Sequence, residues 1–233
     1  MINKIAVPLV SNANYPDPLP ATTQVQGTAL NLLSLEQTGL AFGRMIPVKF
    51  KAGDEVIQQG DTGEHYFFLE SGEAEVWRTD PMTDETSMVA VLGPGSVFGE
   101  EALLLDGCRN ASVCMLTEGR VWTLLKTDFN TLVRPELVDT IQAKDAKAMV
   151  EIGKAQWLDC RYEMEYSEHH IPGAQHLPLD QLRNQTKQLD PDKTHIVYCR
   201  SGRRSAAAAY LLRERGFKAY SLVGGIIDYQ QIC

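Results

Sequence analysis

The stretch HIVYCRSGRRSAAAAYLLRERG, residues 195–216, decides the architecture of the C-terminal part of the chain. Its apolar start, 195–199, predicts a buried strand, and the Ala- and Leu-rich run 204–215 predicts a helix. Between them lies a loop that holds Cys199 and three arginines. A cysteine at that place meets backbone amides and the positive end of a helix, and both favour a thiolate. The loop is therefore a predicted anion site that contains a nucleophile.

The alternation of helix and strand continues on both sides of this loop. Two helical patterns each precede a short apolar run, and a third apolar run follows the long helix. These segments are residues 143–152, 156–160, 179–189, 195–199 and 218–223. Helices that alternate with short apolar strands indicate a parallel α/β sheet. We therefore predict a small α/β domain over 141–233, with the join near Ile141.

Residues 46–125 have a different texture, in which short strand-like runs are separated by glycine-containing turns. Alternation at this spacing predicts an antiparallel barrel or sandwich. Apolar residues in 28–43 predict a short amphipathic helix before it. We assign 28–140 to this domain. The Pro-, Asn- and Thr-rich residues 1–27 are assigned to an extended leader or linker.

Composition and charge narrow the classes of function. The 233 residues carry a formal net charge of -8, which argues against general binding to nucleic acid or to an anionic membrane. No apolar run approaches the roughly 20 residues of a membrane helix, and Pro8 breaks the apolar start that a signal peptide would need. Five cysteines with no CxxC pair and no zinc spacing indicate free thiols in a reducing cytoplasm. We expect a cytoplasmic protein with no metal site, no nucleic-acid partner and no membrane partner.

The stretch GPGSVFGEEALLLDGCRNASV, residues 93–113, carries the predicted ligand site of the barrel. The stretch begins with Gly93-x-Gly95, which could open a dinucleotide-binding GxGxxG motif. The next glycine, Gly99, comes one place too late for that motif, and no βαβ pattern surrounds it. Gly99 instead predicts a turn that opens a short helix, whose free amides attract an anion. Arg109 could close over a phosphate with paired donors, and Glu100 offers an acceptor for a ribose hydroxyl. This combination suits a cyclic nucleotide, and the alternative is a barrel that keeps the stretch only as a turn.

A known family matches this stretch. Residues 44–133 resemble the cyclic-nucleotide-binding domain of the catabolite activator protein and of the protein kinase A regulatory subunit. The family's phosphate-binding cassette, FGE-x-[AG]-L…R-x-A-[TS]-V, is matched by 98–103 and 109–113. We call residues 98–113 the cassette. The resemblance implies a jelly-roll-like antiparallel β barrel, a double-stranded β-helix, with flanking helices.

The resemblance also implies roles for cassette residues. Glu100 would bind the ribose 2′-hydroxyl and Arg109 the cyclic phosphate, while the amides of Gly99 and Ala102 would assist. Asn110 stands where the family usually has a small residue or a hydroxyl, and the choice between cAMP and cGMP stays open. Barrels of this family often pair through a long C-terminal helix, which implies a homodimer. Residues 128–140 leave little room for that helix, so the pocket is expected to be open-topped or covered by the second domain.

Two classes of enzyme use a strand, a cysteine loop and a helix, and loop length separates them. Protein tyrosine phosphatases place an arginine six residues after the cysteine, where this chain has Ser205. Here Arg204 arrives one place earlier. The shorter loop leaves less space for a tetrahedral phosphate but suits a sulfur atom. We therefore favour sulfur transfer over phosphatase activity, and an inert buried Cys199 is the remaining alternative.

Residues 142–229 resemble a single-domain rhodanese, a thiosulfate sulfurtransferase-like family. The family's D-x-R is matched at 159–161, and its E-[YF]-x-x-G-H-I-P-G-A is matched at 165–174 with His169 in place of the glycine. The YCRSGRRS loop and the late L-x-G-G at 222–225 complete the match. The resemblance implies a small α/β rhodanese domain with a parallel sheet.

This second resemblance implies a sulfur site that needs no cofactor. Cys199 would accept sulfane sulfur as a persulfide and pass it to a thiol or to cyanide. The backbone amides of 200–204 would form a cradle, and the arginines among them would attract an anionic donor such as thiosulfate, although not all three can point inward. The predicted site residues are Cys199, Arg200, Ser201, Gly202, Arg203 and Arg204. We call residues 199–204 the cysteine loop.

Other candidates have simpler interpretations. Asp159 and Arg161 are expected to order the strand end and nearby loops, and Cys160 to belong to the core. His169 and His170 beside Glu168 do not predict a metal site, because adjacent residues of an extended segment point to opposite sides.

The leading hypothesis is a cytoplasmic sulfurtransferase whose rate changes when cyclic nucleotide binds to the barrel. The short helical connector at 128–152 would link the two sites. One alternative is a non-enzymatic nucleotide sensor whose rhodanese domain carries a persulfide or docks a partner. Another is an active rhodanese with a vestigial barrel.

Overall fold

The computed structural model describes residues 33–81 and 83–232. The predicted leader, 1–27, and Cys233 lie outside the described residues. The chain divides into two compact units between Glu136 and Leu137. This division falls before the join predicted near Ile141, because 140–141 pairs with the sheet of the second unit.

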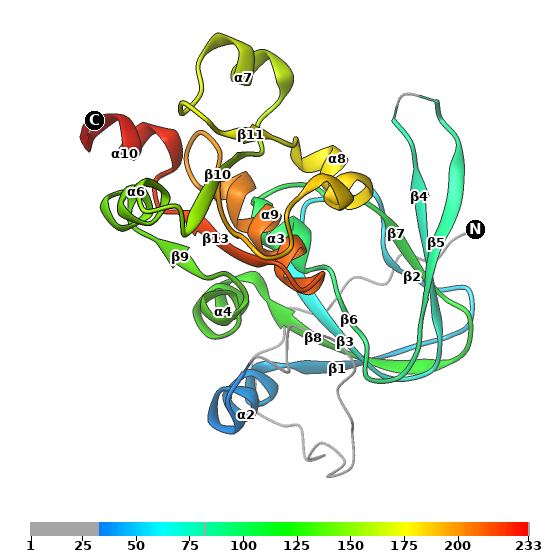
Figure 1. The fold of residues 1–233 in the computed structure, drawn as a ribbon. Helices are drawn as coiled ribbons and strands as arrows, with labels where there is room; N and C mark the ends of the chain where they lie inside the picture. The colour runs from blue at the N-terminus through cyan, green and yellow to red at the C-terminus, as the bar shows by residue number, and fades with distance from the viewer. Residues whose placement is uncertain (1–32, 82, 233) are drawn as a thin grey trace. The chain divides into compact units, whose positions relative to one another are not determined.

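The first unit is built from antiparallel strands (Figure 1). Its strands are β1 (Ile46–Phe50), β2 (Glu55–Ile57), β3 (His65–Ser71), β4 (Ala74–Thr79), β5 (Thr86–Leu92), β6 (Val97–Phe98), β7 (Ser112–Met115) and β8 (Gly119–Leu125). One four-stranded sheet has the order β1-β8-β3-β6 and the other the order β2-β7-β4-β5. Two such sheets form the jelly-roll-like arrangement that the sequence predicts, and this prediction is confirmed.

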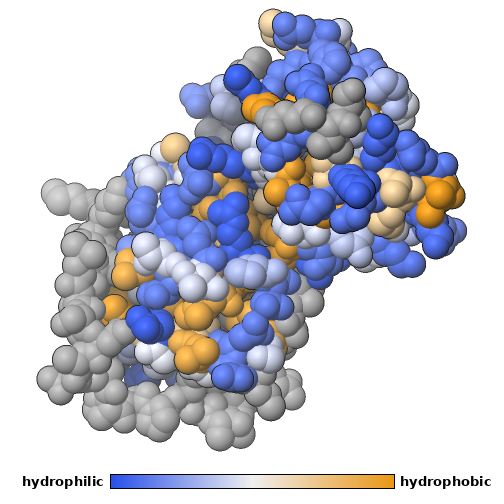
Figure 2. Space-filling model, turned by 90° about the vertical axis from the view of Figure 1, so that its left-hand side faces the viewer, coloured by the Kyte–Doolittle hydropathy of each residue, from blue (hydrophilic) through white to orange (hydrophobic). Residues whose placement is uncertain are grey.

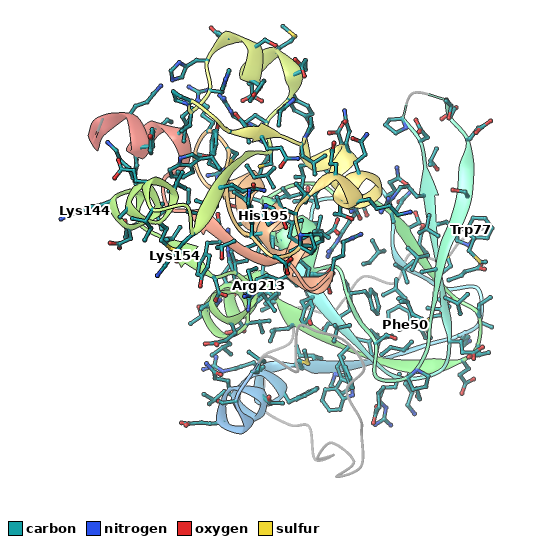
Figure 3. All side chains as sticks on the ribbon, viewed as in Figure 1. Phe50, Trp77, Lys144, Lys154, His195 and Arg213 are labelled. Carbon is teal, nitrogen blue, oxygen red and sulfur yellow. The ribbon has the colours of Figure 1, made fainter. Side chains whose placement is uncertain are left out.

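Apolar side chains from both sheets form the core of the barrel. The rings of Phe67 and Phe98 stack at a centroid distance of 5.1 Å. The other buried members are Phe50, Ile57, Leu69, Ala74, Val113, Met115 and Val121. Phe50 lies among the barrel strands in Figure 3. The period-two alternation of β3, in which Phe67 and Leu69 share one face, supplies this core as the sequence pattern predicts.

Short helices flank the barrel, and those in the described residues are α2 (Leu35–Arg44), α3 (Glu100–Leu105), α4 (Lys126–Leu132) and α5 (Arg134–Leu137). Ser34 caps α2, because its hydroxyl accepts the Gln37 amide proton at 3.2 Å while the Gln37 side chain accepts from the Ser34 amide at 2.8 Å. The Gln37 side chain also donates to Glu136 at 2.7 Å. The helix predicted over 28–43 thus begins at Leu35 within the described residues and is tied to the last residue of its unit.

The second unit holds a five-stranded parallel sheet with the order β11-β10-β12-β13-β9. Its strands are β9 (Thr140–Ile141), β10 (Ala155–Asp159), β11 (Gln175–His176), β12 (Thr194–Tyr198) and β13 (Lys218–Leu222). Its helices are α6 (Ala143–Glu151), α7 (Glu163–Glu168), α8 (Leu179–Gln185), the 3-10 turn η1 (Thr186–Gln188), α9 (Arg203–Glu214) and α10 (Gly225–Ile232). The predicted parallel α/β sheet is confirmed.

Helices cover both faces of the parallel sheet, and alternate strand residues serve each face. Trp157 of β10, Tyr198 of β12 and Leu222 of β13 pack with α6 and α10. On the other face, Ser221 of β13 hydrogen-bonds to Ser205 of α9 at 2.9 Å. The carboxyl ends of β10 and β12 lie side by side, and the cysteine loop leaves the sheet there.

The surface has the mixed character of an ordinary globular protein. On the face drawn in Figure 2, hydrophobic residues are interspersed among hydrophilic ones. None of the helices in 33–81 and 83–232 has the length and apolar character needed to cross a lipid bilayer.

Candidate functional sites

Arg109 lies buried beside the turn that precedes α3. Its Nη1 donates to the carbonyl of Gly99 at 2.7 Å, and its Nη2 donates to the carbonyl of His65 at 2.6 Å. The guanidinium carbon stands 5.4 Å from the ring centre of Phe67. Burial lowers the pKa of Arg109 to about 10, against the opposing charge of Glu100, so the side chain remains a cation at neutral pH. The barrel thus holds a desolvated positive charge whose two side-chain hydrogen bonds end on neutral carbonyls.

The turn requires a glycine at position 99. Its φ is +88°, and an added Cβ would lie 2.8 Å from Nη1 of Arg109 and 3.1 Å from the Phe67 ring. A glycine at the N-cap of α3 has no side chain with which to cap the helix, and no side-chain cap hydrogen bond is formed there. Glu100 is half-buried and close enough to raise the pKa of Arg109 by its charge. A cation, a carboxylate and helix-start amides therefore meet at one turn.

The other two predicted nucleotide-site residues have different surroundings. Ala102 is 3% exposed, and Gly63 packs so closely on it that a Cβ at Gly63 would lie 2.6 Å from that of Ala102. Asn110 is exposed, and its side-chain amide donates to the carboxylate of Glu101. Its carbonyl accepts from Nε of Arg78 at 3.2 Å. The amide group of Asn110 is thus engaged with α3 itself.

Cys199 follows β12 and is 1% exposed. The amide of Gly202 donates to its Sγ at 3.2 Å, and the hydroxyl of Ser205 lies 3.7 Å from Sγ. The pKa of Cys199 is lowered to about 5, and the largest cause is the neighbouring Cys160 thiol. Burial acts in the opposite direction and raises the pKa. Hydrogen bonds from Ser205 and from the amide of Ser201 lower it further. Cys199 is therefore a thiolate at neutral pH, cradled by the amides of its own loop.

Glycines shape the cysteine loop from both sides. Gly202 has a φ of +93° and is the N-cap residue of α9, whose first residues complete the cysteine loop. Gly225, at the start of α10, packs so tightly on the loop that a Cβ there would lie 2.7 Å from the carbonyl carbon of Arg200. The amide of Ile226 donates to the carbonyl of Cys199 at 2.8 Å. The L-x-G-G motif thus packs against the cysteine loop and helps to fix its backbone.

The three arginines of the loop have unequal surroundings. Arg204 forms a two-fold ion pair with Glu165 of α7, at 2.6 and 2.7 Å, and its guanidinium carbon lies 5.4 Å from the ring centre of Tyr162. This pair raises the pKa of Arg204 and lowers the pKa of Glu165. Arg200 and Arg203 are exposed. The loop therefore presents two exposed cations, while Arg204 anchors it to α7.

Asp159 and Arg161 form a buried frame beneath this site. The Asp159 carboxylate, which is fully buried, accepts from the amide, Nε and Nη2 of Arg161. Arg161 also donates to the carbonyl of His169. The hydroxyl of Tyr198 accepts from the amide of Ile171 at 3.0 Å. Asp159 and Arg161 therefore order the end of β10 and the 169–171 segment, as expected from the sequence.

Sequence reasoning missed two partners of the cysteine loop. Cys160, expected only as core, is buried, its thiol donates to the carbonyl of Tyr198 at 3.3 Å, and it is the largest cause of the lowered pKa of Cys199. The available signal was a cysteine at the central position of the D-x-R motif, at the end of the predicted strand 156–160. Glu165 stood within the E-Y motif, but only the fold shows that it pairs with Arg204. His170, considered beside a metal, instead stacks on Tyr166 at 4.0 Å.

Comparison with known proteins agrees with this geometry. A model of the cyclic nucleotide-binding domain family matches residues 47–136, and a model of the rhodanese-like domain family matches residues 142–232. The chain is a cyclic nucleotide-binding domain followed by a rhodanese-like domain. The cassette lies within the first of these domains and the cysteine loop within the second.

Individual relatives match one domain each. The cAMP-dependent protein kinase regulatory subunit of Debaryomyces hansenii is 35% identical over 118 residues, which are 51% of this chain and 25% of that subunit. The regulatory domain of Toxoplasma gondii protein kinase A, solved with cAMP, is 32% identical with a TM-score of 0.42, over 44% of this chain and 39% of that one. A rhodanese-related protein of Thermoplasma volcanium is 30% identical with a TM-score of 0.38, over 40% of this chain and 92% of that one. The chain spans between 20% and 47% of the length of the curated relatives it matches.

Proposed function

We propose that this protein is a sulfurtransferase that moves sulfane sulfur through a persulfide on Cys199, and that cyclic nucleotide bound to the barrel changes its rate. The observation that carries the catalytic half is the position of Cys199 just before α9, where the Gly202 amide donates to its Sγ at 3.2 Å; in this setting the pKa of Cys199 is lowered to about 5. The thiolate attacks the outer sulfur of thiosulfate, the S–S bond of thiosulfate breaks, and sulfite leaves. An acceptor thiolate or cyanide then attacks the terminal sulfur and restores the Cys199 thiolate.

The loop suits each step of this cycle. The amide of Gly202, 3.2 Å from Sγ, stabilises negative charge on the sulfur before and after transfer. Arg200 and Arg203 are exposed cations that attract a doubly charged donor. Arg204 is neutralised by Glu165 and holds the loop in place. The exposed arginines are thus assigned to donor capture and the amides to charge stabilisation.

The depressed pKa of Cys199 predicts the pH dependence of persulfide formation. The reactive thiolate is present above the pKa and is lost as pH falls through it, so the rate with thiosulfate stays level from pH 8 to pH 6 and halves near pH 5. An ordinary cysteine, with a pKa of about 8.5, would instead give a rate that rises through pH 8. Rapid quenching and mass measurement of the sulfur-loaded chain across pH checks this. A midpoint near that of an ordinary cysteine contradicts the assigned thiolate.

The buried cation Arg109 supports the nucleotide half of the proposal. It stands beside Glu100 at the start of α3, and a cyclic phosphate would supply the anion that its two carbonyl partners do not. The similarity to cAMP-dependent protein kinase regulatory subunits favours cAMP over cGMP as the ligand. Calorimetric titration of the full chain with each nucleotide tests this choice, and equal or absent binding of both would reject it.

We infer that the two sites communicate through the short segment α5, whose residues fall on both sides of the division between the units. At its start, Arg134 donates to the carbonyl of Leu104 in α3 at 3.3 Å. At its end, the carbonyl of Leu137 accepts from Arg213 of α9 at 2.9 Å, and Arg213 also pairs with Asp139 at 3.4 Å. Helix α3 belongs to the cassette, and α9 begins at the cysteine loop. A ligand that binds two positions of α3 with different affinity would therefore bias α9 through α5.

This route predicts a variant in which the two sites are uncoupled. We expect Arg134→Ala to bind cAMP and to transfer sulfur without nucleotide as the wild type does, while losing most of the rate change that cAMP causes. The reason is that Arg134 joins α5 to α3 but touches neither ligand. Steady-state thiosulfate:cyanide assays with and without cAMP measure the difference. Arg120→Ala, which breaks an ion pair with Glu70 elsewhere on the barrel, is the control. A wild-type response in Arg134→Ala contradicts the route.

The burial of Cys199 favours one second candidate function. Because its side chain is only 1% exposed, small acceptors have limited access, which suits a persulfide carrier that hands sulfur to a docked partner. In that case the protein is a nucleotide sensor rather than an enzyme. Complete loading of Cys199 by thiosulfate together with very slow turnover to cyanide or small thiols would favour the carrier. Rapid turnover with small acceptors would favour the enzyme.

A further inference from the structure

We propose that Cys160 is a second thiol of the sulfur site, which discharges the Cys199 persulfide as hydrosulfide by forming a Cys160–Cys199 disulfide. The proposal rests on the persulfide chemistry proposed above. It adds a second reacting residue and a second product, made when no external acceptor is present.

The parallel pairing of β10 and β12 places the two cysteines side by side. Asp159, the last residue of β10, is opposite Tyr198, the last residue of β12, and Cys160 and Cys199 are the next residues of the chain after them. The amide of Cys160 donates to the carbonyl of Tyr198 at 3.1 Å, so the ladder of hydrogen bonds continues past the strand ends. Neighbouring strands lie about 4.8 Å apart, within the roughly 4.4–6.8 Å that a disulfide needs between Cα atoms. The bond can therefore form with little backbone movement.

The two thiols are both buried and differ in their state of ionisation, so Cys160 must give up its proton as it attacks. Both residues are 1% exposed, and the Cys160 thiol donates to the carbonyl of Tyr198, the residue before Cys199, at 3.3 Å. Burial and the neighbouring Cys199 raise the pKa of Cys160, so Cys160 keeps its proton while Cys199 is ionised. A protonated thiol is thus held against the sulfur that becomes the inner atom of the persulfide.

The reaction balances without an outside oxidant. Sγ of Cys160 attacks Sγ of Cys199 in the persulfide, a Cys160–Cys199 S–S bond forms, and the bond to the terminal sulfur breaks. The terminal sulfur of the persulfide anion takes the proton of the Cys160 thiol and leaves as hydrosulfide. The two cysteine sulfurs are oxidised and the sulfane sulfur is reduced. Each chain then releases one hydrosulfide and stays closed until a dithiol reductant reopens the disulfide.

The experiment loads the full chain with sulfur and follows its fate without an acceptor. Reduced protein is treated anaerobically with thiosulfate and, in a parallel arm, with inorganic polysulfide, and is then desalted. Intact mass and a sulfide electrode follow the chain over time. In the wild type we expect the added sulfur to disappear, two hydrogens to be lost, and one hydrosulfide to appear per chain. In Cys160→Ser we expect the persulfide to persist and hydrosulfide release to slow at least about tenfold.

Controls separate this inference from the proposed function. Cys114→Ser, a substitution in the barrel, should behave as the wild type, and peptide mapping should find the new disulfide between residues 160 and 199. A wild-type persulfide as long-lived as that of Cys160→Ser overturns the inference. A chain that gains no sulfur from thiosulfate contradicts the proposed function instead. In that event the polysulfide arm alone decides about Cys160, because polysulfide loads a thiolate without catalysis.

Discussion

Cys199→Ser is expected to abolish sulfur transfer. A serine hydroxyl is not ionised at neutral pH and forms no persulfide, so the amides of the loop have no sulfur to stabilise. We expect the thiosulfate:cyanide rate to fall at least about a thousandfold, as removal of a nucleophile does in other covalent enzymes. The variant should also gain no sulfur in mass measurements after thiosulfate treatment. Both readouts use the full chain under reducing conditions.

The control for this substitution is another cysteine of the same chain. Cys114→Ser changes a half-buried thiol on β7, far in sequence from the cysteine loop, and should transfer sulfur at the wild-type rate. Equal thermal unfolding of the two variants would show that neither loses activity by unfolding. If Cys199→Ser keeps its activity, the assignment of Cys199 as the sulfur carrier is wrong.

Arg109→Ala is expected to weaken nucleotide binding by about 10- to 100-fold, because a hydrogen bond to a charged group contributes about 1.5–3 kcal/mol. Arg109→Lys should recover only part of this loss. A lysine keeps the charge but lacks the forked donors that reach both Gly99 and His65 in the wild type. Calorimetry of the full chain with cAMP gives the dissociation constants.

A matched arginine on the same barrel controls for changes in charge. Arg120 pairs with Glu70 at 3.3 Å on β8 and β3, outside the cassette, and Arg120→Ala should bind cAMP as the wild type does. Arg109 is buried, so the unfolding temperatures of both variants must be compared as well. Wild-type affinity in Arg109→Ala would mean that the cassette is kept only as a turn.

Most of the fold was predictable because its signals are local. The apolar run 195–199 and the Ala-rich run 204–215 predict the strand and helix found at 194–198 and 203–214 within one residue. A turn was predictable at Gly99 because glycine is typical of turns. The structure shows why glycine is needed there, since both the left-handed φ and the approach of the Arg109 side chain require it. The period-two runs likewise indicated antiparallel sheets.

What escaped prediction depends on contacts between distant segments. The partnership of Cys160 with Cys199 follows from the register of β10 against β12, which no local pattern specifies. The pairing of Arg204 with Glu165 depends on where α7 packs. The division at Glu136–Leu137 depends on β9, two residues long, pairing with β13 far along the chain. A strand that short has too few residues for a periodic signal.

The central claim is that the two domains form one nucleotide-regulated sulfurtransferase. It is tested most directly by the thiosulfate:cyanide rate of the full chain across a cAMP titration, with Arg109→Ala beside it. The account predicts a rate that changes with cAMP and saturates with the binding curve in the wild type, and that stays level in Arg109→Ala over the same concentrations. A wild-type rate that stays level while calorimetry shows the nucleotide bound would contradict it.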